Sequence, residues 1–150
     1  MRTIIVAFAV ALAAVPAAAS EKTDVMATVY QFIDGFNKGD TKSALAACAA
    51  QSAIIDDFPP HEWQGATACA DWANDFAADS KKNGITDPIV KLGKPRHVDV
   101  TGDRAYVVVP ATYTYKQKGK PVTESGSILT VALQKVAAGW RMTGWAWAKH

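Results

Sequence analysis

Two adjacent carboxylates, Asp56 and Asp57, occupy the position in this 150-residue chain that best suits acid–base chemistry. Asp56 is the last residue of a short, mainly apolar run, 52–56, whose alternation predicts a strand. Asp57 and then Phe58-Pro59-Pro60 follow it. A carboxylate that faces an apolar pocket resists ionisation, so its pKa rises and it can act as a base near neutral pH. An aspartate in this position can instead accept hydrogen bonds from the following turn. The pattern leaves both interpretations open.

The other titratable side chains form no recognisable catalytic or metal-binding set. His61 follows the proline turn and could shuttle protons, although a histidine in an exposed loop is usually only solvated. His97 and His150 have no partner at ligand spacing, so we expect no metal and no cofactor. Arg141 lies in a predicted strand. If it faced inward it could pair with Asp56, lower the pKa of that carboxyl and favour an anionic ligand.

Aromatic side chains are numerous, with five tryptophans, five phenylalanines and four tyrosines. Large rings mainly fill hydrophobic cores, but some could line a concave pocket that accepts a flat or aromatic molecule. By simple alternation, Arg141 shares one face of the last predicted strand with Trp145 and Trp147. Tyr113 and Tyr115 share a face of an earlier strand, and that face could form a homodimer surface.

The first 19 residues have the pattern of a secretory signal peptide. Arg2 precedes an apolar run, 4–15, and small residues follow at 17–19. The run is too short for a membrane-spanning helix, which needs about 20 apolar residues. We therefore expect cleavage after Ala19, a periplasmic or secreted protein, and no membrane association once the signal peptide is removed. The mature chain, 20–150, is long enough for one domain.

Cysteine content and charge narrow the possible functions further. Exported proteins fold in an oxidising compartment, so we expect Cys48 and Cys69 to form a disulfide between two helices, with two buried free thiols as the alternative. Without Arg2 the chain has 15 basic and 14 acidic side chains. This balance gives no electrostatic basis for binding nucleic acid.

The elements that position these residues follow from hydrophobic periodicity. Apolar residues at helical spacing predict helices over 24–38, 40–50 and 66–82, with the strand 52–56 between the last two. Alternation then predicts strands over 89–100, 104–116, 122–136 and 139–148. Glycines and prolines inside these long strands require bends, so the sheet should curl around the helices. The predicted fold is α+β, with three N-terminal helices packed on a curved antiparallel sheet in the order α-α-β-α-β-β-β-β.

This order resembles the nuclear transport factor 2-like superfamily, which includes the SnoaL-like polyketide cyclases and the ketosteroid isomerases. Four motifs carry the resemblance: Phe36-Asn37-Lys38-Gly39-Asp40, Ala53-Ile54-Ile55-Asp56, Trp63-Gln64-Gly65-Ala66 and Gly139-Trp140-Arg141-Met142. Together they cover nearly all of 20–150. The resemblance implies a cone-shaped, cystatin-like sheet with a ligand pocket at its open end, beside the first strand.

The resemblance also implies a role for Asp56. Aligned without gaps from Asn37, Asp56 falls where the ketosteroid isomerases place the aspartate that moves a proton beside a carbonyl group. Phe32, however, stands where that branch has an oxyanion-stabilising tyrosine. The strands 104–116 and 139–148 also lack the second acid of the isomerases. Steroid isomerisation by that mechanism is therefore not expected.

Three functions are compatible with these observations. The first is an exported domain that binds a small hydrophobic or aromatic molecule in an apolar pocket. The second is a lyase or isomerase that acts on a small hydrophobic carbonyl compound, with Asp56 as acid and base. The third is a dimeric interaction module with a vestigial pocket. The residues expected to line the pocket are Phe32, Ile54, Asp56, Trp63, Arg141, Trp145 and Trp147.

Overall fold

Three helices and a curved sheet make up the computed structural model, which describes residues 16–150. The helices are α1 (Pro16–Lys38), α2 (Thr41–Ala46) and α3 (Ala68–Asn83). Most of the predicted signal peptide, 1–15, lies outside the described residues. Within the described part, no helix combines the length and hydropathy that crossing a bilayer requires.

The strands form one seven-stranded sheet. They are β1 (Cys48–Ile55), β2 (Glu62–Gly65), β3 (Ile85–Leu92), β4 (His97–Thr101), β5 (Arg104–Gln117), β6 (Lys120–Val136) and β7 (Gly139–Ala148). Their spatial order is β2-β1-β7-β6-β5-β3, and β4 also pairs with β5. The β1–β7 pair is parallel, and the other pairs are antiparallel. The predicted α+β class is confirmed, and the sheet is mixed rather than wholly antiparallel.

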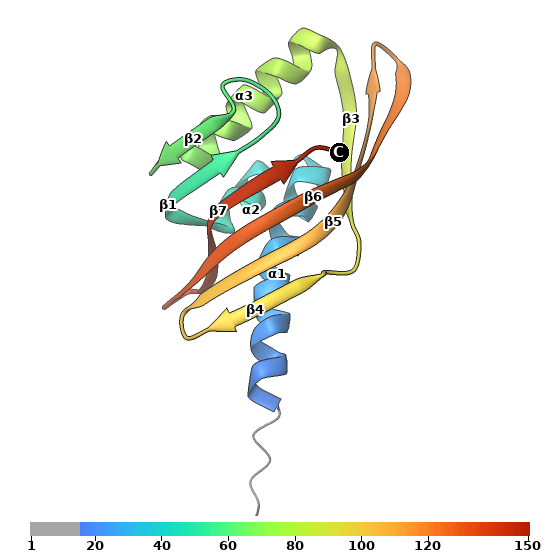
Figure 1. The fold of residues 1–150 in the computed structure, drawn as a ribbon. Helices are drawn as coiled ribbons and strands as arrows, with labels where there is room; N and C mark the ends of the chain where they lie inside the picture. Colours follow the sequence, from blue (N-terminus) through green and yellow to red (C-terminus); the bar gives the residue numbers. More distant parts are fainter. Residues whose placement is uncertain (1–15) are drawn as a thin grey trace, which may run out of the picture.

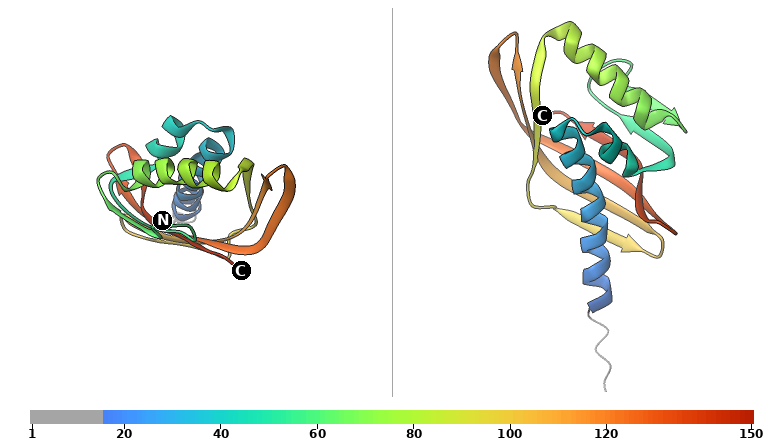
Figure 2. Two further views of the ribbon diagram at one scale, coloured as in Figure 1. Left: turned by 90° about the horizontal axis from the view of Figure 1, so that it is seen from above. Right: turned by 180° about the vertical axis from the view of Figure 1, so that it is seen from behind.

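The helices lie on the concave side of the sheet, which curls around them (Figure 2). The predicted apolar stripe of α1 packs against the sheet, since Val25, Val29 and Phe32 are all buried. Gly39 then ends the helix in the left-handed conformation, and Asp40 Oδ1 accepts a hydrogen bond from the backbone N–H of Ser43 to cap α2. This short connection keeps α1 and α2 side by side.

The second helix is shorter than predicted, because tertiary pairing overrides the helical propensity of its alanines. α2 ends at Ala46, and Cys48 begins β1, where it pairs with Met142 of β7. The carbonyl of Ala47 accepts a hydrogen bond of 2.8 Å from the backbone N–H of Met142. The predicted strand 52–56 is therefore the second half of a longer strand, and the loop after it contains the short strand β2.

The predicted strand 89–100 is divided in two by Gly93 and Pro95. β3 and β4 pair with successive parts of β5, and backbone hydrogen bonds continue across the break from Gly93 N–H to the carbonyl of Pro110. Two β-bulges add to the curvature. One leaves Thr143 as an extra residue in β7, and the other falls near Gly126 in β6, where φ is +84°.

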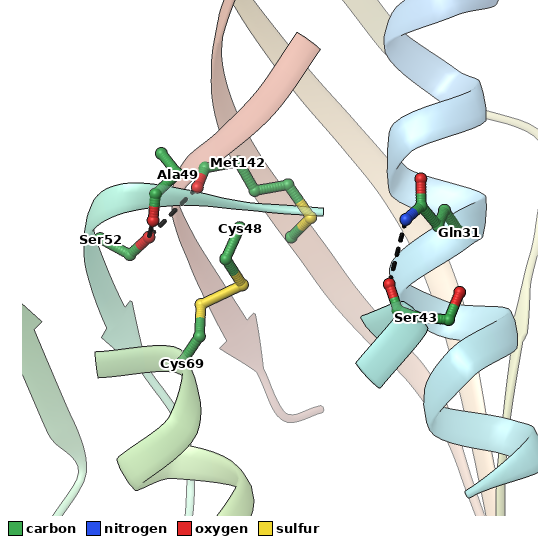
Figure 3. Close-up of a disulfide and its surroundings, with 7 residues drawn as sticks. All are labelled: Gln31, Ser43, Cys48, Ala49, Ser52, Cys69 and Met142. Atoms are coloured by element: carbon green, nitrogen blue, oxygen red, sulfur yellow. Dashed lines mark hydrogen bonds between the residues drawn. A yellow bond between two sulfur atoms is a disulfide. The ribbon is translucent and has the colours of Figure 1, made fainter. Parts of the chain in front are cut away.

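A disulfide joins Cys48, at the start of β1, to Cys69, in the first turn of α3 (Figure 3). The expected pairing is therefore present, but Cys48 belongs to a strand and not to a helix. Ser52 supports the same corner, since its hydroxyl donates to the carbonyl of Met142 at 3.2 Å. The bond fixes β1, which Asp56 directly follows, to α3, which carries Trp72.

Candidate functional site

A narrow cavity lies between the concave face of the sheet and the helices α1 and α3. Its empty volume is about 490 Å³ including the mouth. Three lining residues carry a carboxylate or a hydroxyl group, and the others are aliphatic or aromatic. The lining consists of Phe32, Ile33, Phe36, Asp56, Asp57, Phe58, Trp72, Phe76, Val90, Tyr113, Leu129, Trp145 and Trp147.

Aromatic rings form most of the cavity wall and hold one another in place. Trp72 and Trp145 meet edge to face with their ring centroids 4.9 Å apart, and Phe32 lies 5.7 Å from both. Phe36 and Phe58 close the wall around Phe76 at 5.1 and 5.7 Å. Tilted and edge-to-face contacts of this kind are the arrangements that aromatic pairs prefer. The wall therefore offers an apolar, aromatic surface to a ligand.

Asp56 follows the last residue of β1 and points into this aromatic cavity. The indole N–H of Trp72 donates to its Oδ2 at 2.8 Å, and the backbone N–H of Asp57 donates to its Oδ1 at 2.7 Å. Burial raises the pKa of Asp56 from 3.8 to about 7, although both hydrogen bonds act in the opposite direction. Asp56 therefore both faces the pocket and caps the following turn, so the two interpretations of the sequence are compatible.

Two buried hydrogen-bond donors of the lining residues have no acceptor among the described residues. They are the hydroxyl of Tyr113, on β5, and the indole N–H of Trp145, on β7, and both atoms are buried. Burial raises the pKa of the Tyr113 hydroxyl above its usual value, helped by the negative charges nearby. The phenol is thus a donor at any physiological pH.

Four of the seven residues expected to line a pocket do line this cavity: Phe32, Asp56, Trp145 and Trp147. Ile54, Trp63 and Arg141 are not among its lining residues. Ile54 is fully buried and pairs with Trp63 across β1 and β2. The Trp63 indole N–H is bound to Asp75 Oδ2 at 2.8 Å, and its ring lies behind Phe58 at 5.1 Å. Both therefore support the cavity wall from outside.

Arg141 lies outside the cavity because β7 contains a bulge. Trp140 and Met142 are buried, Thr143 is the extra residue, and Trp145 is buried again. Simple alternation from Trp145 back to Arg141 therefore fails. The Arg141 side chain donates to the neighbouring carbonyl of Trp140 at 2.7 Å, so the pairing with Asp56 that an inward Arg141 would have allowed is not formed.

Tyr113 and Tyr115 do share a face with buried Val107 and Val109, as alternation predicts, but this is the inner face. Tyr113 lines the cavity, which contradicts its placement on a dimer surface. Sequence analysis also missed Trp72 as a lining residue. Its spacing of four residues from Phe76 on a predicted helix could have indicated that both rings face the same side.

The mouth of the cavity carries charged groups. Lys149 Nζ lies 3.2 Å from Asp57 Oδ2 and 3.0 Å from Glu124 Oε1, so it bridges the rim between the β1–β2 loop and β6. His61 stays exposed, and its Nδ1 lies 3.1 Å from the carbonyl oxygen of Asp56. Within 16–150, no three side chains of the metal-ligating types come together as a candidate metal site.

The sequence profile of the SnoaL-like domain matches residues 25–146, most of the chain. The protein belongs to the SnoaL-like family. No curated protein matches its sequence significantly. The match agrees with the resemblance on which the role of Asp56 was predicted, and it covers the helices, the β1–β2 loop and nearly all of the sheet.

Solved structures share this SnoaL-like fold at low sequence identity. A ketosteroid isomerase-like protein from Erwinia carotovora atroseptica is 17% identical, with a TM-score of 0.67, 86% of this chain covered and 95% of the other. A nuclear transport factor 2-like protein from Salmonella enterica is 15% identical, with a TM-score of 0.74 and coverages of 89% and 93%. A candidate dehydratase of the same superfamily from Streptomyces avermitilis is 16% identical, with a TM-score of 0.71 and coverages of 88% and 97%.

Proposed function

We propose that this SnoaL-like protein binds a small, flat, mainly apolar carbonyl compound in the cavity, and that Asp56 moves a proton on it. The observation that carries the proposal is a partly buried carboxylate in an aromatic cavity, with a pKa raised to about 7. At that value the group is present in both protonation states at neutral pH. It can therefore accept a proton and return it, which general acid–base catalysis requires.

The apolar lining supports a ligand that is mostly hydrocarbon or aromatic. A ligand with its own negative charge would meet Asp56 and Asp57 in a medium that screens charge poorly. Lys149 does not offset this repulsion, because it is already shared between Asp57 and Glu124. A neutral ligand is therefore favoured over the anionic one that an inward Arg141 would have implied.

The proposed chemistry starts at a carbon next to the carbonyl group. Ionised Asp56 takes a proton from that carbon, which leaves an enolate and a neutral carboxylic acid. When the next two carbons of the ketone are joined by a double bond, the anion is a dienolate, and return of the proton to its far carbon gives an isomer. Transfer of the proton to a hydroxyl group on the next carbon instead releases water, so the overall reaction is a dehydration. The name of the Streptomyces relative, a candidate dehydratase, agrees with the second outcome.

A second hollow, of about 800 Å³ including its mouth, gives the cavity room to adapt. It opens among α1, α2 and α3, and it shares the rings of Phe32, Phe36, Trp72 and Phe76 with the first cavity. The wall between them is thus one layer of side chains thick. We expect these rings to move toward the second hollow when a ligand wider than the empty cavity binds.

Exchange of deuterium into 2-tetralone, a flat bicyclic ketone, tests the proposed reaction. The protein should accelerate exchange of the protons beside the carbonyl in D2O, followed by proton NMR. Asp56→Asn should lower the protein-catalysed rate by about 100-fold or more, because the base is lost. Asp75→Asn is the matched control, since this carboxylate also accepts an indole hydrogen bond but is not among the cavity-lining residues. Equal rates for the wild type and Asp56→Asn would refute catalysis by Asp56.

Export is proposed separately from the reaction. The signal-peptide pattern of 1–19 and the disulfide between β1 and α3 both suit an oxidising compartment outside the cytoplasm. Expression in a bacterial host should give a periplasmic protein whose first residue, by N-terminal sequencing, is Ser20. An uncleaved chain that stays in the cytoplasm would contradict this proposal.

A further inference from the structure

We propose that the hydroxyl of Tyr113 binds the carbonyl oxygen of the ligand, and so makes the cavity specific for molecules with an acceptor oxygen. This inference rests on the proposed function, because it names the group that orients the ligand which Asp56 would act on. It also replaces an expectation from the family resemblance, in which the donor would come from the position that Phe32 occupies.

The comparison with the neighbouring tyrosine shows why the Tyr113 hydroxyl is unusual. The two rings pack together with their centroids 4.8 Å apart. The hydroxyl of Tyr115 donates to Glu124 Oε1 at 2.9 Å, whereas the hydroxyl of Tyr113 is buried with no partner among the described residues. Buried polar groups are nearly always hydrogen-bonded, because an unpaired donor has lost its water and gained nothing. Of these two neighbouring tyrosines, only Tyr113 therefore has a buried hydroxyl that is free to bind a ligand.

No acceptor of the cavity-lining side chains is bound to the Tyr113 hydroxyl. The lining carboxylates are those of Asp56 and Asp57, and both have other partners. Asp56 accepts from Trp72 and from the backbone of Asp57, and the Asp57 carboxylate pairs with Lys149. The other lining side chains are aliphatic or aromatic and carry no carbonyl or carboxylate oxygen. A ligand that enters the cavity with an acceptor oxygen can therefore supply the partner that Tyr113 lacks.

The fold places this donor on a different wall from the base. Asp56 ends β1, near one edge of the sheet order, and Tyr113 lies on β5, three strands away in that order. Tyr113 is nevertheless a lining residue of the same cavity, since the sheet curls, and its ring meets Trp147 edge to face at 6.3 Å. A ligand that spans the cavity can place its oxygen at Tyr113 while an adjacent carbon faces Asp56.

The test compares two ligands of the same shape, 2-tetralone and tetralin, which lacks the oxygen. Dissociation constants are measured by isothermal titration calorimetry for the wild type, Tyr113→Phe and Tyr115→Phe. Tyr113→Phe should weaken 2-tetralone binding by about 3- to 10-fold, the worth of one hydrogen bond, and leave tetralin binding within about twofold. Tyr115→Phe should leave the ratio of the two constants unchanged, because its hydroxyl is already paired.

Thermal unfolding of the ligand-free variants tests the state of the two tyrosine hydroxyls without any binding measurement. Tyr113→Phe removes a hydroxyl that has no partner, so its midpoint of thermal unfolding should equal or exceed that of the wild type, whereas Tyr115→Phe should unfold at lower temperature. An unchanged ratio of dissociation constants in Tyr113→Phe would overturn the inference and leave the proposed function standing. If only Trp145→Phe lost the preference for 2-tetralone over tetralin, the ligand oxygen would be bound by the indole N–H of Trp145, and the assignment to Tyr113 would be wrong. Failure of both ligands to bind the wild type would reject the proposed function, and this inference with it.

Discussion

Replacing Asp56 by asparagine should remove a pH dependence of stability that the buried carboxyl imposes on the wild type. The pKa of this group is about 7 in the folded chain and 3.8 when unperturbed. Between these values the folded state therefore holds a proton that the unfolded state has released. The free energy of unfolding must then fall as pH rises from about 4 to 7, and the fall ends above the folded-state pKa.

The size of the effect follows from the shift. A difference of about three pKa units, at about 1.4 kcal/mol for each, corresponds to roughly 4 kcal/mol between pH 4 and pH 8. This is a large part of the 5 to 15 kcal/mol that stabilises a typical domain. Below pH 4 the carboxyl is neutral in both states, and its burial costs the fold no ionisation energy.

Urea denaturation of the wild type and Asp56→Asn, repeated at intervals from pH 4 to pH 8, measures this dependence. The difference between the two proteins isolates Asp56, because every other titrating group is common to both. Asp75→Asn should keep the fall seen in the wild type. If the wild type and Asp56→Asn changed in parallel across this range, the carboxyl would ionise normally, and the proposed base would have no physical basis.

Three further changes test the surroundings of the site. Trp72→Phe removes the indole donor to Asp56, so the pKa of that carboxyl should rise further and its titration, followed by carbon-13 NMR, should move to higher pH. Gly144→Ala should destabilise the fold by about 1–3 kcal/mol in urea denaturation, because the added methyl group would lie 2.7 Å from the carbonyl oxygen of Ala53 in β1. Gly93→Ala is its control, with a nearest atom at 3.5 Å, and should cost less than about 1 kcal/mol. Replacing both cysteines by alanine should lower the free energy of unfolding by about 3 kcal/mol, since their bond spans 21 residues, and an unchanged denaturation midpoint would refute that contribution.

Periodicity predicted the helices and long strands well, because these elements bury one face. The stripe of Val25, Val29 and Phe32 fixed the orientation of α1, and alternation located β5, β6 and β7 to within a few residues. The parallel pairing of β1 with β7 could not be found in this way. It depends on contacts between residues about 90 positions apart, such as Cys48 with Met142, which no local pattern encodes.

The candidate site was only partly predictable, and the errors have physical causes. Trp145 and Trp147 line the cavity as expected, but the extra residue at Thr143 reverses the alternation before them and moves Arg141 out of the site. Alternation placed Tyr113 and Tyr115 on one face of their strand but left open whether that face formed a dimer surface. The face that carries Val107 and Val109 is the more apolar one, so the sequence of β5 alone could have placed Tyr113 on the inner face.

The proposed chemistry therefore depends on how two distant parts of the sheet are brought together. The proposed base, Asp56, directly follows β1, which the disulfide and the Trp72 hydrogen bond fix to α3. The unpaired donor comes from β5, which reaches the cavity only because the sheet is strongly curved. With Phe32 on α1, the helix supplies a hydrophobic wall and no donor to the cavity. In the proposed arrangement the carboxylate follows β1 and the donor to the ligand oxygen lies on the sheet, at Tyr113 of β5.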